Sequence, residues 1–131
     1  MDTQVYTELS SDTLTVFIRG EIDHHSAHGI REAIDRDVFF YRTPKVVLDL
    51  STIDFMDSSG LGLILGRYRK IKDIGSELIL KDPSEEIMKI IKLAGVDKFI
   101  KIIRKEKSLI RVKGFTNKER GGKNNEKKSD Q

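Results

Sequence analysis

Short runs of β-branched and other apolar residues alternate along the chain with longer segments in which apolar residues recur every three or four positions. The runs have the length and composition of β-strands. They predict strands over residues 4–10, 13–22, 45–50, 77–81 and 99–103. The segments with the longer period predict helices over residues 25–41, 57–74, 84–93 and 106–112. Strands that alternate with helices indicate an α/β domain with a mainly parallel sheet and right-handed crossovers.

Two of the predicted strands carry further information. Only Ser11 and Asp12 separate the first strand from the second, and these residues suit a tight turn, so the pair is expected to form a hairpin. The strand over 45–50 is rich in Val and Leu, which is typical of a strand buried on both faces. The sheet is therefore expected to be mixed, with one antiparallel pair among parallel neighbours.

The charge of the chain is concentrated at its carboxyl end. Residues 113–131 contain six Lys or Arg and three Asp or Glu, which accounts for the entire net charge of +3 and leaves residues 1–112 neutral. From residue 116 onward there is no apolar residue, so we expect a disordered basic tail after a single domain over residues 1–112. The basic pI therefore reflects the tail, and no direct nucleic-acid partner is expected.

The composition excludes several classes of site. No cysteine is present, which rules out disulfides, thiolate zinc sites and cysteine nucleophiles. The amino terminus has neither a basic region nor a long apolar stretch, and no run reaches the roughly 20 apolar residues that span a bilayer. We therefore expect a cytoplasmic protein without a membrane partner.

The segment Asp57-Ser58-Ser59-Gly60 stands between a predicted strand and the following helix, at the carboxyl edge of the sheet, where α/β folds place their sites. One interpretation is structural, because Asp57 or Ser58 suits a helix cap. The other is that Ser58 or Ser59 accepts a phosphate, which a helix start can hold without unfolding and which adds about −1.5 to −2 charges. The two interpretations are compatible, since a capping serine can still be phosphorylated.

Acidic residues lie where such a phosphate could meet them. Glu21 stands at the end of the second predicted strand and Asp23 directly follows it, and Asp57 adjoins the two serines. If the loop after the second strand reaches the same edge of the sheet, a phosphate on Ser58 or Ser59 would add to existing negative charge. The combined charge would repel an acidic partner or a bound nucleotide.

Four motifs stand in a characteristic order along the chain. They are GEIDHHSA at residues 20–27, VVLDL at 46–50, FMDSSGLG at 55–62 and ILGRY at 64–68. Together they resemble the anti-sigma factor antagonists of the STAS family, in particular the sporulation members, over about residues 4–110. The resemblance implies a STAS-type single α/β domain with a mixed, mostly parallel sheet and helices packed mainly on one face.

The resemblance also implies a function without catalysis or a cofactor. Unphosphorylated members bind an anti-sigma factor that is also a serine kinase, and so release a sporulation sigma factor. The kinase binds ATP or ADP, and in its ATP form it phosphorylates the first serine of the DSSG motif, here Ser58, which switches binding off. A metal-dependent serine phosphatase reverses this step. The implied partner-binding residues are Glu21, Asp23, Asp57, Ser59, Gly60, Leu61 and Gly62.

Other functions remain compatible with the residues. A STAS module could bind a nucleotide directly or serve another signalling complex. Ser58 could be the nucleophile of a small hydrolase, although the chain has no G-x-S-x-G motif. His24, His25 and His28 could bind a metal, but neighbouring histidines do not easily converge on one ion, so no metal is expected.

The helix after the DSSG motif carries a basic run made of Arg67, Arg69, Lys70 and Lys72. The simplest interpretation of such a run is a solvated helix face rather than a surface for nucleic acid. All four side chains are therefore expected to be exposed.

Overall fold

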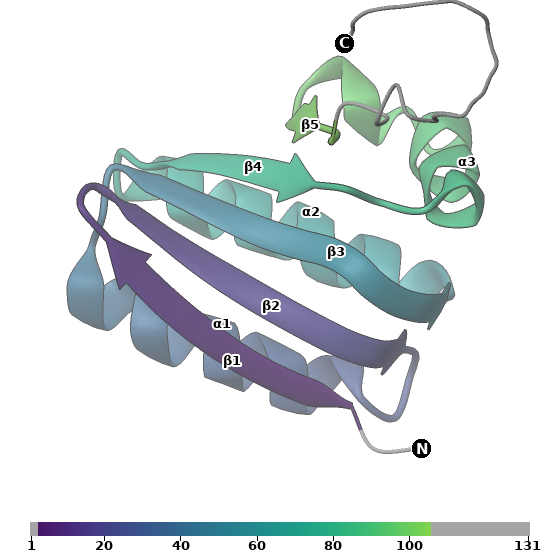
Figure 1. The fold of residues 1–131 in the computed structure, drawn as a ribbon, viewed down its shortest axis with the longest axis horizontal. Helices are drawn as coiled ribbons and strands as arrows, with labels where there is room; N and C mark the ends of the chain where they lie inside the picture. The colour runs from purple at the N-terminus through teal and green to yellow at the C-terminus, as the bar shows by residue number, and fades with distance from the viewer. Residues whose placement is uncertain (1–2, 106–131) are drawn as a thin grey trace, which may run out of the picture.

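The computed structural model describes residues 3–105, which form a five-stranded sheet with three α-helices and one 3-10 helix (Figure 1). In chain order the elements are β1 (Gln4–Ser10), β2 (Thr13–Ile22), α1 (Ala27–Tyr41), β3 (Lys45–Met56), α2 (Ser58–Asp73), β4 (Glu77–Lys81), α3 (Glu85–Leu93), η1 (Val96–Lys98) and β5 (Lys101–Ile103). The strands lie in the sheet in the same order as in the sequence. β1 and β2 are antiparallel, and the other neighbours are parallel. The predicted α/β fold with an opening hairpin is confirmed.

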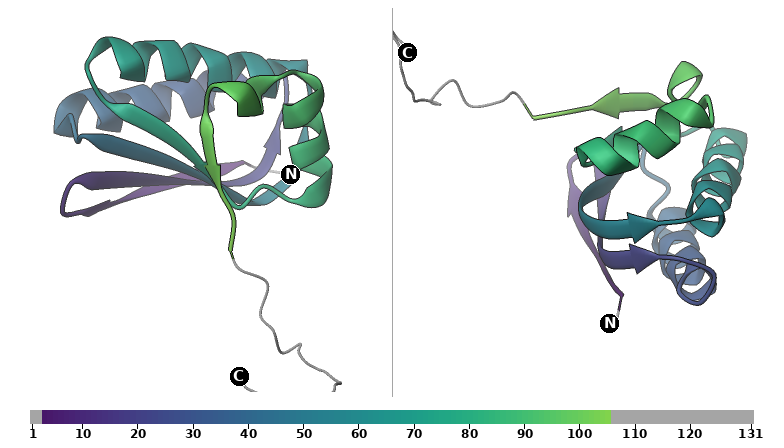
Figure 2. Two further views of the ribbon diagram at one scale, coloured as in Figure 1. Left: turned by 90° about the horizontal axis from the view of Figure 1, so that it is seen from above. Right: turned by 90° about the vertical axis from the view of Figure 1, so that its right-hand side faces the viewer.

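The two longest helices cover one face of the sheet. Figure 1 shows α1 and α2 behind the strands, and the perpendicular views of Figure 2 show both helices on the same side. Right-handed crossovers that step the same way along a sheet place their helices on one face, so this arrangement follows from the strand order. α3 contacts η1 and β3. Within residues 3–105, no helix is long and apolar enough to cross a membrane.

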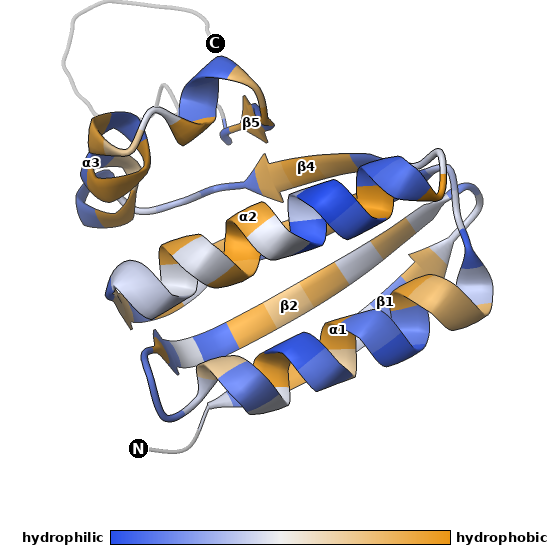
Figure 3. Ribbon diagram, turned by 180° about the vertical axis from the view of Figure 1, so that it is seen from behind, coloured by the Kyte–Doolittle hydropathy of each residue, from blue (hydrophilic) through white to orange (hydrophobic). Residues whose placement is uncertain are grey.

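The core lies between the sheet and these two helices. In β2, Leu14, Val16 and Ile18 are almost completely buried, whereas the residues between them are partly exposed. α1 contributes Ile34 to the same core, and α2 contributes Ile64. In Figure 3, apolar and polar segments alternate along both helices, which is the pattern of helices with one buried face.

β3 is longer than predicted. It runs from Lys45 to Met56, whereas the sequence predicts a strand that ends at residue 50. Its pairing with β4 stops at Asp49, so the second half of β3 is bonded on one side only, to β2. Polar residues are tolerated in that half because their side chains are exposed, while Ile53 and Met56 remain buried.

Two other boundaries differ from the prediction. β5 spans Lys101–Ile103 rather than 99–103 and is partly exposed rather than buried, because the residues before it close η1 and because β5 is the edge of the sheet. α1 begins at Ala27 rather than at residue 25, because a hydrogen-bonded turn around Asp23 precedes it. Two predictions lie outside the described residues, namely the helix over 106–112 and the tail over 113–131.

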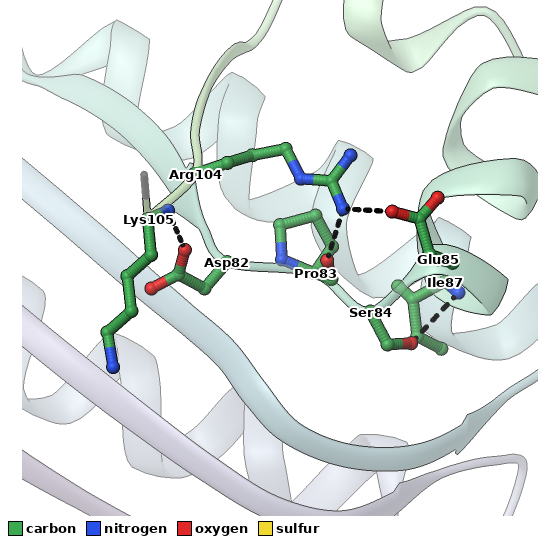
Figure 4. Close-up of polar contacts among 7 residues, drawn as sticks. All are labelled: Asp82, Pro83, Ser84, Glu85, Ile87, Arg104 and Lys105. Atoms are coloured by element: carbon green, nitrogen blue, oxygen red, sulfur yellow. Dashed lines mark hydrogen bonds and ion pairs between the residues drawn. The ribbon is translucent and has the colours of Figure 1, made fainter. Parts of the chain in front are cut away.

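Polar contacts tie the end of β5 to the connection between β4 and α3 (Figure 4). The Arg104 guanidinium donates to the Glu85 carboxylate at 3.0 Å, and the backbone N–H of Lys105 donates to the Asp82 carboxylate. Ser84 caps α3, since its hydroxyl oxygen accepts a hydrogen bond from the Ile87 N–H at 3.2 Å. These contacts hold the last described strand against the start of α3.

Replacing Ser84 with Ala is expected to lower the free energy of unfolding by about 1 kcal/mol, the typical cost of losing an N-cap. The change removes the acceptor of the Ile87 N–H and disturbs nothing in the core, because Ser84 is exposed. Denaturant unfolding would measure the loss. Ser84→Asp is the matched control and should stay within about 0.5 kcal/mol of the wild type, because a carboxylate also caps a helix. Equal losses in both variants would contradict the capping role.

Candidate functional site

Helix α2 starts directly at the carboxyl ends of β2 and β3. Asp57 is its N-cap, and Oδ1 of this residue accepts a hydrogen bond from the Ser59 N–H at 2.8 Å. The backbone carbonyl of Asp57 accepts from the N–H groups of Gly60 and Leu61, at 3.0 and 3.3 Å. From the sequence, Asp57 and Ser58 were alternative caps; the structure shows that Asp57 takes this position.

The first turn of α2 presents its two serines differently. Ser58 is exposed, whereas Ser59 is partly buried and donates its backbone N–H to the cap. Ser58 is therefore the more exposed of the two serines. Further along the segment, Gly60 is buried, Leu61 is partly buried and Gly62 is exposed.

The end of β2 lies beside this turn. Glu21 pairs with Phe55, and Ile22 pairs with Met56. The N–H of Asp57 donates to the Ile22 carbonyl at 3.2 Å, which joins the start of α2 to the last residue of β2. The loop after β2 therefore begins at the same edge of the sheet as the DSSG motif, which meets the condition that the sequence left open.

Asp23 organises the loop that carries it. Its Oδ1 accepts hydrogen bonds from the N–H groups of His25 and Ser26, both at 2.9 Å. The Ser26 hydroxyl accepts from the Asp23 N–H at 3.0 Å and donates to the Glu21 carbonyl at 2.7 Å. The hydrogen bond from the Ser26 N–H is the main cause that lowers the pKa of Asp23 below its ordinary value, so the carboxylate is charged at neutral pH. Asp23, directly after β2, and Glu21, near the end of that strand, thus give an ordered acidic loop region at this edge.

A close packing contact fixes the start of α2 on the sheet. A Cβ at Gly60 would lie 2.2 Å from Met56 Cγ and 3.2 Å from Ile22 Cγ2. Met56 and Ile22 are both buried, so neither side chain has free space to move into. Glycine is required at position 60 because it has no side chain, whereas a Cβ at Gly62 would meet nothing within 4 Å.

A groove of about 340 Å³ between α1 and α2 opens beside the first turn of α2. Its lining residues are His24, Ala27, His28, Arg31, Ser59, Gly62, Leu63, Gly66 and Arg67. Two arginines and two histidines are among them, and no carboxylate is. Ser59 and Gly62 belong both to this groove and to the segment that carries the DSSG motif.

Arg67 is buried, which corrects the prediction of a fully solvated basic run. Its side chain is 5% exposed, and Nε lies 3.2 Å from Oδ1 of Asp35 in α1. The two groups are not aligned for a hydrogen bond, and within the described structure Nε and Nη1 have no hydrogen-bond partner. Burial lowers the pKa of Arg67, and the charge of Asp35 opposes this shift. Arg69, Lys70 and Lys72 are exposed, as predicted.

The spacing of apolar residues in α2 contained the signal for this burial. Arg67 follows Leu63 by four residues and Ile64 by three, and both of those residues are buried. Residues at these separations share one face of a helix. Arg67 therefore lies on the inner face of α2, and it is the polar residue near the site that the sequence prediction missed.

The three histidines of the α1 region do not converge. His24 and His28 line the groove between the helices, whereas His25 lines a separate cavity together with Glu21 and Asp23. Within residues 3–105, no three His, Cys, Asp or Glu are placed so that they could hold a metal ion. The histidines therefore form parts of two different surfaces at the start of α1.

The sequence also matches a family model, described as the STAS domain, over residues 4–109. The chain belongs to the STAS family. Both the resemblance drawn from the four motifs and the STAS-type fold are thereby confirmed.

Relatives of this STAS protein include proteins with a named function. The anti-sigma F factor antagonist of Paenibacillus polymyxa is 34% identical over 106 residues, which cover 81% of this chain and 91% of that protein. The unphosphorylated form of the anti-sigma factor antagonist SpoIIAA has a similar structure, with a TM-score of 0.67 and 28% identity over 87% of this chain and 100% of that one. The phosphorylated form of SpoIIAA from Bacillus has a TM-score of 0.62 and 27% identity, over 84% and 100% of the two chains.

Proposed function

We propose that this STAS protein is an anti-sigma factor antagonist. The relative from Paenibacillus polymyxa and the structurally similar SpoIIAA both carry that function in their names. In this proposal the unphosphorylated chain binds an anti-sigma factor in the cytoplasm. A sporulation sigma factor that the anti-sigma factor had held is thereby released. The chain itself acts as a binding regulator and a phosphorylation substrate, not as an enzyme.

The exposure of Ser58 is the observation that carries the proposed switch. Ser58 lies in the first turn of α2, where N–H groups and the helix dipole favour a negative group. The structure of SpoIIAA is known in an unphosphorylated and a phosphorylated form, and this fold is similar to both. This similarity supports the proposal that the domain can carry a phosphate without unfolding. We assign the phosphate transfer to the anti-sigma factor, acting as a serine kinase with bound ATP, and its removal to a serine phosphatase.

Negative charge on Ser58 would oppose binding. A phosphate adds about −1.5 to −2 charges. Glu21 and Asp57 already bring carboxylates to this edge of the sheet. Like charges that meet in an interface cost several kcal/mol, so a partner that presents acidic groups here would be released on phosphorylation.

The proposed docking surface combines the first turn of α2 with the acidic loop after β2. Its residues are Glu21, Asp23, Asp57, Ser59, Gly60, Leu61 and Gly62. Exposure supports this role, because Gly62 offers open backbone and Leu61 offers a partly exposed apolar side chain. Gly60 is buried, so it would support this surface from beneath. Neither a cofactor nor nucleic acid takes part in the proposed interaction.

Incubation with the anti-sigma factor and ATP, followed by mass spectrometry, tests the proposal. We expect one phosphate per chain, on the peptide that contains Ser58, and none in the Ser58→Ala variant. Ser59→Ala is the matched control. It removes a hydroxyl of the proposed docking surface but leaves the cap, which uses the backbone of Ser59, so phosphate should still appear on Ser58 even where docking is weaker. A phosphate on Ser59, or no phosphate from a kinase that modifies the Paenibacillus polymyxa relative, would contradict the proposed switch.

A further inference from the structure

The groove between α1 and α2 holds positive charge that the proposed switch does not use. Arg31 and Arg67 line it, together with two histidines, and its lining contains no carboxylate. The Arg67 side chain is only 5% exposed, and its Nε and Nη1 atoms are buried without a hydrogen-bond partner in the described structure. Buried donors in native structures are nearly always satisfied, so a guanidinium that has an ion pair with Asp35 but no hydrogen bond at two of its nitrogens is short of acceptors.

Asp35 compensates this charge only in part. Its carboxylate lies 3.2 Å from Arg67 Nε but is not aligned with the N–H, and it is itself partly exposed. Arg31 adds a second positive charge near Arg67, which together with burial lowers the pKa of Arg67. A second acidic group in the groove would add a charge partner for the Arg67 guanidinium and reduce the repulsion between the two arginines.

Two of the α2 residues that line the groove are glycines, and we call this part of the lining the floor. Gly62 and Gly66 are one turn apart on α2, and a Cβ at either position would meet nothing within 4 Å. Glycine destabilises a helix interior, and the packing of this domain does not require it at either position. The absent side chains leave room for a partner to approach α2 closely and to reach the buried arginine.

We propose that an acidic side chain of the anti-sigma factor inserts into this groove, where Arg31 and Arg67 bind its carboxylate. The inference rests on the proposed function. Continuity supports this partner, because Ser59 and Gly62 line the groove and also belong to the proposed docking surface. The positive charge of the groove favours an acidic side chain as its occupant. It disfavours residues 113–131 of the chain itself, because they are net basic.

A phosphate on Ser58 would repel the partner's carboxylate that is bound in the groove. Ser58 precedes Ser59, which lines the groove, so a phosphate there places negative charge close to the inserted side chain. Attraction by the two arginines holds the partner in the unphosphorylated state, and repulsion by the phosphate opposes it afterwards. The groove and the switch thus act on the same group of the partner.

Matched charge reversals on α1 test the groove. Arg31 and Arg36 are both exposed, but only Arg31 lines the groove. Arg31→Glu should weaken affinity for the anti-sigma factor by about tenfold or more and should flatten the dependence of the association rate on salt. Arg36→Glu changes the net charge equally and should change affinity by less than about twofold. Because Arg31 repels Arg67, its reversal should not destabilise the fold, and thermal unfolding would verify this.

Matched glycine substitutions test the floor. Gly66→Ala adds a methyl group to a residue that lines the groove and also a neighbouring cavity beside Tyr68, whereas Gly29→Ala adds one on α1 outside the groove, and both positions have open space for a Cβ. Both variants should fold at least as stably as the wild type. Affinity for the anti-sigma factor should fall severalfold in Gly66→Ala and fall less in Gly29→Ala, because Gly29 lines the neighbouring cavity of Glu21 and Asp23 and not the groove.

The results distinguish a failure of the groove proposal from a failure of the proposed function on which it rests. If the wild-type protein binds no anti-sigma factor, the proposed function fails and the groove proposal fails with it. If the wild type binds, and Arg31→Glu and Gly66→Ala bind as tightly as their controls, the groove proposal alone is overturned. Tighter binding by Arg31→Glu would also overturn it, because the partner would then be basic at this position.

Discussion

The variant Ser58→Asp is expected to bind the anti-sigma factor about 100-fold more weakly than the wild type, a difference of about 2.7 kcal/mol. Ser58 is exposed and is not the cap of α2, so the new carboxylate disturbs neither the core nor the helix start. It adds charge next to Asp57 and near the end of β2, where Glu21 lies. Like charges facing each other in an interface cost several kcal/mol. Isothermal titration calorimetry with the anti-sigma factor would measure the loss.

Two further variants make this result specific. Ser58→Ala removes the phosphoacceptor without adding charge, so it should bind within about threefold of the wild type and should stay bound when ATP is added. Ser10→Asp adds the same charge at the other end of β2, where Ser10 pairs with Thr13, and should leave affinity unchanged. Equal affinities of Ser58→Ala and Ser58→Asp would refute the proposed switch.

Replacing Gly60 with Ala is expected to lower the free energy of unfolding by about 1–3 kcal/mol, the usual range for an overpacked site. The added methyl group would overlap Met56, at 2.2 Å from Cγ and 2.7 Å from Sδ. Either the Met56 side chain leaves its buried position or the start of α2 lifts from the sheet. The higher helix propensity of Ala, roughly 0.5–1 kcal/mol, offsets only part of this cost. Denaturant unfolding would measure the difference.

Gly62→Ala is the matched control for this prediction. It lies two residues further along the same helix, where a Cβ meets nothing within 4 Å, so stability should be unchanged or higher by about 0.5–1 kcal/mol. Gly62 belongs to the proposed docking surface, so this variant should fold well and yet bind the anti-sigma factor more weakly. A Gly60→Ala protein as stable as the wild type would show that Met56 repacks without cost.

The element types could be predicted because alternation and helical spacing follow directly from burial. The predicted end of β3 was wrong because the second half of this strand is paired on one side only. Ser51 and Thr52 are exposed and polar, yet they belong to β3, since β2 alone supplies the hydrogen bonds along that half of the strand. A polar stretch after a buried strand indicates a loop when only the sequence is known. The true end of β3 depends on where its neighbour β2 ends, which is a property of the assembled sheet.

The position of the DSSG motif in the fold could also be predicted, but not which of its residues caps the helix. A strand followed by a helix places the connecting segment at the sheet edge, so the DSSG motif was located correctly. The choice of Asp57 over Ser58 as the cap depends on the backbone conformation of a single residue, because both side chains can accept an N–H. The burial of Arg67 depends on α1 lying against α2, a tertiary contact that a run of basic residues does not reveal.

The strand order of the sheet bears on the kind of ligand that the domain can serve. In doubly wound folds the order of strands reverses at one point, and the loops that diverge there leave a crevice that encloses small molecules. Across residues 3–105 every connection steps in the same direction, from β1 to β5, so the sheet has no such reversal. Because such a sheet has no crevice of this kind, its ligands bind on the outer surface of its helices and loops. That geometry favours a large partner that attaches and leaves over a metabolite that must be enclosed.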